Sequence, residues 1–186
     1  MARAAKPLLN GLAIILAIPA STSCYAEEKQ VINEQFHISV AYPDSWAQVP
    51  VTVPNEVFQF FSLLGKGSAG CGVSANDTKI KTNTDESIVE VYKLMPQVME
   101  GRLLQGFREP EVIERKITTL SNLRAVSIIS AGTYSTLGHE FRMRQWSIIT
   151  QKVGVIYTIT CADLDERFRE SLMAFRNFMS SVFIFP

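Results

Sequence analysis

The stretch "LRAVSIISAGTYSTLGHEFRMRQWSIITQKVGVIYTITC", residues 123–161, decides the fold of this 186-residue chain. It contains three runs rich in β-branched and aromatic residues, at 123–134, 139–150 and 154–161. Only a few residues separate each run from the next. Connectors that short join antiparallel neighbours, because parallel strands need a crossover of about a dozen residues or more. We therefore predict a three-stranded antiparallel meander.

More strands are predicted on the N-terminal side of the meander. Residues 110–120 should form a strand that turns at Ser121 and Asn122 into the meander. Residues 57–64 and 71–75 are strand-like, and the glycine-rich segment between them indicates a hairpin.

The segment "FHISVAYP", residues 36–43, alternates between apolar and polar side chains. A period of two predicts a half-buried strand with His37 on the solvated face. Residues 47–54 carry Pro50 and Pro54, so they can form only an edge strand or a loop. The apolar face of the first strand consists of Phe36, Ile38, Val40 and Tyr42.

Two segments have helical periodicity. The first should begin near Asp85, and Pro96 should kink or split it. The second follows Asp163 and Asp165, either of which can cap it. An antiparallel sheet flanked by helices places the chain in the α+β class. The predicted apolar faces are Ile88, Val91, Tyr92, Met95 and Met99 in the first helix, and Phe168, Leu172, Phe175, Met179 and Val182 in the second.

The N-terminus has the pattern of a secretory signal peptide. Arg3 and Lys6 precede an apolar run over residues 8–18, and about 11 residues are too few to span a membrane, which needs roughly 20. Cys24-Tyr25-Ala26 resembles a small-x-small cleavage site. We predict cleavage after Ala26, export to the periplasm, and a mature chain of residues 27–186 that forms a single domain.

Lipidation of Cys24 is the alternative for this segment. Bacterial lipoproteins resemble a pattern of leucine, two small residues and the lipidated cysteine, and here Ser21 stands at the leucine position. If Cys24 carried a lipid, the mature protein would begin there and be tethered by its N-terminus.

Composition narrows the classes of function. Once residues 1–26 are removed, acidic residues exceed basic ones by two, which argues against a nucleic-acid binder with a clustered basic excess. No later run is apolar enough to span a bilayer. Cys71 and Cys161 then remain as an even pair, either disulfide-bonded in an oxidising compartment or buried as free thiols.

The segment "FHISVAYPDSW", residues 36–46, resembles the opening strand and turn of the PsbP-like and Mog-like superfamily. The same order of elements follows: a mid-chain helix, a meander, and "FRESLMAFRNFMSSVFIF" at the end. The resemblance covers roughly residues 34–186 and implies an α/β/α sandwich. It also implies binding of a protein partner or support of a larger complex without a shared catalytic centre. The leader favours an exported, DcrB-like bacterial branch.

Candidate catalytic and metal-binding residues are few. His37 and His139 are the only imidazoles, and His139 lies beside Glu140 at a strand entrance, where a turn residue is the ordinary interpretation. Ser68 and Ser74 lie among glycines, but "GKGSAGCG" fits neither a nucleophile elbow nor a phosphate-binding loop. We find no cofactor motif and no metal-ligand spacing, so no catalytic residue is assigned.

Arg142, Arg144 and Trp146 lie on one face of a predicted strand. If that face is exposed, it offers a basic and aromatic surface for a protein partner. The ordinary alternative places the arginine stems along the sheet beneath a helix and the tryptophan in the core.

The leading hypothesis is an exported, non-enzymatic accessory or protein-binding domain of the bacterial cell envelope, with a protein partner there. A toxin-neutralising immunity or inhibitor protein is one alternative. An envelope hydrolase that combines His139 with a serine or cysteine is the other.

Overall fold

The computed structural model describes residues 28–63, 68–78 and 87–186. The predicted leader, its cleavage site, Cys24 and Asp85 lie outside these residues. Within them, seven strands form one antiparallel sheet in the order β3-β4-β5-β9-β8-β7-β6. The strands are β3 (Trp46–Val49), β4 (Glu56–Ser62), β5 (Gly70–Asp77), β6 (Arg108–Leu120), β7 (Leu123–Thr136), β8 (His139–Lys152) and β9 (Val155–Leu164).

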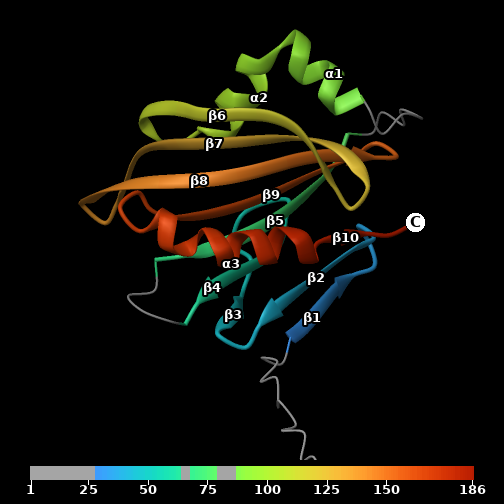
Figure 1. Ribbon diagram of the computed structural model, residues 1–186, viewed down its shortest axis with the longest axis horizontal. Coiled ribbons are helices and arrows are strands. Elements are labelled where there is room, and N and C mark those ends of the chain that lie inside the picture. Colours follow the sequence, from blue (N-terminus) through green and yellow to red (C-terminus); the bar gives the residue numbers. More distant parts are fainter. Residues whose placement is uncertain (1–27, 64–67, 79–86) are drawn as a thin grey trace, which may run out of the picture.

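Helices cover both faces of this sheet (Figure 1). The short helices α1 (Ser87–Leu94) and α2 (Pro96–Leu103) lie on one face, and the long helix α3 (Phe168–Ser181) lies on the other. A three-stranded sheet lies beside α3 and consists of β1 (Glu28–Asn33), β2 (Ile38–Pro43) and β10 (Phe183–Ile184). The predicted α+β architecture, with an antiparallel sheet between helical layers, is confirmed.

Three tight hairpins build the meander from β6 to β9. In each, the two central residues have positive φ: Ser121 and Asn122, Leu137 and Gly138, Val153 and Gly154. Turns of this kind match the right-handed twist of the flanking strands, so they hold the long strands in register. The predicted meander and the turn at residues 121–122 are therefore confirmed.

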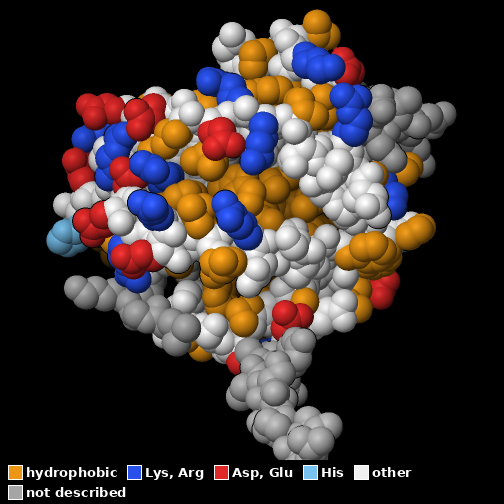
Figure 2. Space-filling view, in the orientation of Figure 1, with side chains coloured by type: hydrophobic (Ala, Val, Ile, Leu, Met, Phe, Trp, Pro, Cys, Tyr) orange, Lys and Arg blue, Asp and Glu red, His pale blue; other side chains and the backbone are white. Residues whose placement is uncertain are grey.

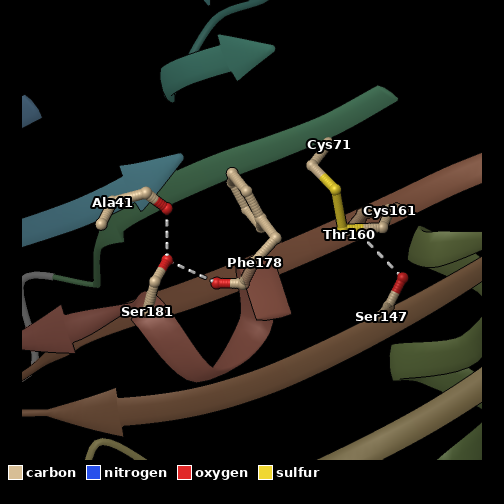
Figure 3. The surroundings of a disulfide bond; sticks show 7 residues. All are labelled: Ala41, Cys71, Ser147, Thr160, Cys161, Phe178 and Ser181. Carbon is tan, nitrogen blue, oxygen red and sulfur yellow. Dashed lines mark hydrogen bonds between the residues drawn. A yellow bond between two sulfur atoms is a disulfide. The ribbon is translucent and has the colours of Figure 1, made fainter. Parts of the chain in front are cut away.

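The larger core lies between the sheet and α3. Trp46 and Phe60 contact the ring of Phe178 on α3, with ring centroids 5.8 Å and 5.3 Å apart. Cys71 on β5 and Cys161 on β9 are directly paired across the two strands and joined by a disulfide (Figure 3). The bond lies beneath α3 in an apolar layer.

The strand predicted from residue 36 begins two residues later. Residues 34–37 form the turn between β1 and β2, and His37 has a φ of 49°. This corrects the prediction that His37 lies on a strand face. The chain end fixes the turn, since the His37 carbonyl accepts from the Phe185 N–H at 2.9 Å. The His37 Nδ1 lies 2.7 Å from the Pro186 carbonyl oxygen.

Candidate protein-binding surface

The row Arg142, Arg144 and Trp146 lies on the α3-facing side of β8, and each member has a partner within the chain. An Arg142 guanidinium nitrogen is 2.7 Å from Glu111 Oε1. Arg144 Nε is 2.6 Å from Asp165 Oδ1, and its guanidinium lies 5.7 Å from the centroid of the Phe168 ring. Trp146 donates its Nε1–H to the Ser127 hydroxyl at 2.8 Å.

These pairings leave little unbalanced positive charge on the row. Figure 2 shows basic and acidic side chains interspersed at the end of the sheet where β8 begins. Binding of a partner by these three residues stays a prediction, and the structure does not make them an open basic patch.

Both histidines lie on the surface of the protein. His139 is exposed at the first residue of β8, and among the described residues no hydrogen bond joins either imidazole to a serine, a cysteine or an acid. The described residues also contain no group of three side chains that could hold a metal ion.

Ser68 belongs to a hydrogen-bond network around the buried Asp163. The Ser68 hydroxyl donates to Asp163 Oδ1 and accepts from Arg167 at 3.1 Å. Asp163 is fully buried and also accepts from the Leu164 N–H at 2.8 Å and the Ser171 hydroxyl at 2.6 Å. The network joins β9, the start of α3 and the Ser68 segment.

The helix pair α1–α2 presents a different kind of surface. Pro96 is the first residue of α2, which separates it from α1 as predicted. Ile88, Tyr92 and Met99 are buried against the sheet. Four apolar side chains nevertheless face solvent, and we call them the α1–α2 patch: Val91 is 39% exposed, Leu94 80%, Met95 49% and Val98 51%.

A groove of about 550 Å³ opens between the helix pair and strands β5, β8 and β9. Three members of the α1–α2 patch border it, and its other apolar walls include Ile149 and Ile156 of the sheet. Among the described residues that line it, Arg102 is the one that carries a charge. The patch and the groove therefore form one apolar surface with a single cation at its edge.

An ion pair fixes α2 to β6. Glu100 is bound in bidentate fashion by Arg115, with nitrogen–oxygen distances of 2.6 Å and 3.0 Å, and Tyr92 donates its hydroxyl to the same carboxylate at 2.8 Å. The hydrogen bond from Arg115 holds the pKa of Glu100 below its usual value of 4.5. Burial, with the nearby carboxylate, raises the pKa of Tyr92 to about 12, so this hydroxyl remains a donor.

Sequence periodicity assigned Val91 and Met95 to the buried face of the helix, and this assignment was wrong. Besides the five residues of the predicted face, the segment carries Val89, Leu94 and Val98, and one sheet face cannot cover all of these apolar side chains. A helical segment with more apolar side chains than one face can hold must leave some of them exposed when only one side has a neighbour.

The fold resembles several solved structures. Cyanobacterial PsbP from Synechocystis sp. PCC 6803 aligns with a TM-score of 0.60 and 17% identity over 91% of this chain and 99% of that one. LpqN of Mycobacterium tuberculosis, described as involved in cell envelope biogenesis, aligns with a TM-score of 0.56 and 15% identity over 86% and 91%. The Saccharomyces cerevisiae Ran-binding protein Mog1p aligns with a TM-score of 0.55 and 7% identity over 86% and 96%.

The chain thus has the PsbP-like and Mog-like fold that its sequence resembles. No family model matches the sequence, and no curated protein does. Among the helices of the described residues, none is long and apolar enough to cross a membrane.

Proposed function

We propose that this protein is an exported, non-enzymatic accessory protein of the bacterial cell envelope that binds a protein partner through the α1–α2 patch. The observation that carries the proposal is the patch itself. Four apolar side chains stand exposed next to a groove of about 550 Å³. Contiguous exposed apolar surface of this kind marks interaction sites, and methionines adapt to the shape of a partner.

Three further observations support an envelope location. The first 26 residues have the pattern of a cleaved leader. A disulfide joins Cys71 and Cys161, and such bonds persist in oxidising compartments. One structure of similar fold, LpqN, is described as involved in cell envelope biogenesis. We place the mature N-terminus at Glu27, with one domain over residues 27–186.

Capture from envelope extract tests the binding surface. We expect the wild-type protein to retain a reproducible partner, and the double variant Leu94→Ser, Met95→Ser to lose it. Both residues are largely exposed, so the variant should unfold at the wild-type temperature. The matched control is Met173→Ser, which changes a methionine on α3 that is 67% exposed. Equal capture by all three proteins would refute the role of the patch.

The intact mass of the protein purified from whole cells of its native host tests the proposed cleavage site. A chain that begins at Glu27 supports cleavage after Ala26. A chain that begins at Cys24 with a diacylglyceryl group contradicts it and shows a lipid anchor instead.

A further inference from the structure

One strip of the central sheet lies beyond the helix pair, on the same face. Because successive side chains alternate, Cys71 and Cys161 point toward α3 while Gly70, Gly72 and Thr160 point to the opposite face. Gly72 lies directly across from Thr160, and both are partly exposed. The glycines leave a depression in the sheet surface, into which the Phe61 ring reaches over Gly70 and the Glu56 carboxyl group over Gly72.

A hollow of about 250 Å³ lies on this strip. Glu56 and Gln59 line it from β4, Thr160 from β9 and Met143 from β8, with the ring of Phe61 at its wall. Its size suits a single chemical group and not a drug-sized molecule, since pockets for the latter begin at roughly 300 Å³.

The carboxyl group of Glu56 lies over Gly72 inside the hollow. A Cβ atom added to Gly72 would be 2.4 Å from Glu56 Oε1, so only glycine leaves room for the carboxyl group there. The Oε2 atom is buried and has no hydrogen-bond partner among the described residues. Burial raises the pKa of Glu56.

An uncompensated carboxylate of this kind is unfavourable for folding. Buried polar atoms in native proteins almost always have partners, and each exception calls for an explanation. No ion pair joins Glu56 to a cation in the part of the chain that the structure describes. A group that costs stability at a surface hollow is characteristic of a binding site.

We propose that this hollow binds a cationic group, a primary ammonium or a guanidinium, with the Glu56 carboxylate as its counter-ion. The cation supplies the missing hydrogen bond to Oε2, Phe61 and Met143 provide apolar walls, and Thr160 and Gln59 provide polar contacts. The group belongs either to a free amine or to a lysine or arginine side chain of a bound protein. The site does not depend on the α1–α2 patch.

Nuclear magnetic resonance titration of the purified, oxidised protein tests the proposal. The probes are n-butylammonium and methylguanidinium, with n-butanol as the neutral control. We expect saturable shifts at the amides of Gly70 and Gly72 with either cation and none with butanol. Binding should weaken as the pH falls toward the pKa of Glu56, because the protonated carboxyl group no longer attracts the cation.

Two variants of the hollow should lose this response. Glu56→Gln should weaken binding at least tenfold. Gly72→Ala should do the same by displacing the carboxyl group, and the flexible glutamate side chain can move without unfolding the sheet. The matched control Glu34→Gln changes an exposed glutamate in the β1–β2 turn and should bind like the wild type. Shifts that persist in Glu56→Gln, or that butanol reproduces, would overturn the proposal.

Thermal unfolding separates a binding role from a structural one. If Glu56 serves binding, Glu56→Gln should unfold at the same temperature as the wild type or higher at pH 7, because the desolvated charge is gone. A clear loss of stability would show that Glu56 supports the fold, which contradicts the proposal. Native mass spectrometry of the isolated protein then tests for a free amine, which adds its mass to the wild type and not to Glu56→Gln. A lysine or arginine side chain as the source instead gives capture of a protein by the wild type that Glu56→Gln loses.

Discussion

At the scale of single residues, the buried Asp163 connects three segments of the chain. Its two oxygens accept from Ser68, Ser171 and the Leu164 N–H, which come from three different segments. It is fully buried, so no water replaces a lost partner.

Asp163→Ala should therefore lower the free energy of unfolding by about 2–4 kcal/mol, because three donors lose their acceptor at once. Ser171→Ala removes one donor and should cost about 1 kcal/mol. Urea denaturation measures both values. A change below about 0.5 kcal/mol for Asp163→Ala would contradict this account of the network.

The ion pair between Glu100 and Arg115 predicts a dependence of stability on pH. The pKa of Glu100 in the folded protein lies below 4.5, so the pair stabilises the fold fully above pH 4.5 and loses its effect as the pH falls through the folded-state pKa. Arg115→Met should cost about 1 kcal/mol at pH 7, since half of the arginine side chain is in water.

The difference between Arg115→Met and wild type should shrink when urea denaturation is repeated below pH 4. Lys93→Met breaks the exposed Lys93–Glu90 pair and serves as the control, with almost no effect at either pH. An Arg115→Met effect that stays constant with pH would show that the arginine acts only through packing.

At the scale of elements, the hairpin turns are where the chain departs from local preference. Leu137 and Val153 have φ values of 50° and 46°, a region that costs residues other than glycine and asparagine about 1–2 kcal/mol. Both are exposed, so their side chains contribute little packing. Asn122 already has the favoured residue type at such a position.

Leu137→Asn and Val153→Asn should each raise the free energy of unfolding by about 0.5–1 kcal/mol. The reverse change, Asn122→Leu, should lower it by a similar amount. Chemical denaturation of the three variants gives the comparison. A destabilised Leu137→Asn protein would mean that the leucine has a packing role that its exposure does not reveal.

The long strands were predictable because short connectors and alternating apolar residues act locally. Strand β1 was not predicted, since "EKQVIN" is mostly polar and exposed and is held by pairing with β2. Strand β10 has only two residues, too few for any period. The α1–α2 patch was missed because periodicity counts apolar residues and does not say which side of a helix has a neighbour.

At the scale of the whole molecule, the disulfide joins two halves of the sequence. Strands β3 to β5 come from the first half and β6 to β9 from the second, and within the described residues of the large sheet they meet only where β5 pairs with β9. Cys71 and Cys161 lie on this pair, 90 residues apart in sequence. The sequence shows the two cysteines but not that they are close in space, because this depends on the pairing of β5 with β9.

The double variant Cys71→Ala, Cys161→Ala should lose about 2–4 kcal/mol of unfolding free energy, and its urea dependence should become steeper. A bond across about 90 residues restricts the unfolded chain by roughly 4–5 kcal/mol in the chain-entropy account, and relaxation of the core offsets part of this. Denaturation with and without a reductant measures the effect. A loss below about 1 kcal/mol would contradict it.

The same bond affects what happens when a protease cuts the chain. A single cut at any peptide bond between residues 71 and 161 leaves both fragments covalently attached. Outside the cell's reducing interior, the two fragments of a nicked molecule would therefore stay linked and could refold together as a unimolecular process.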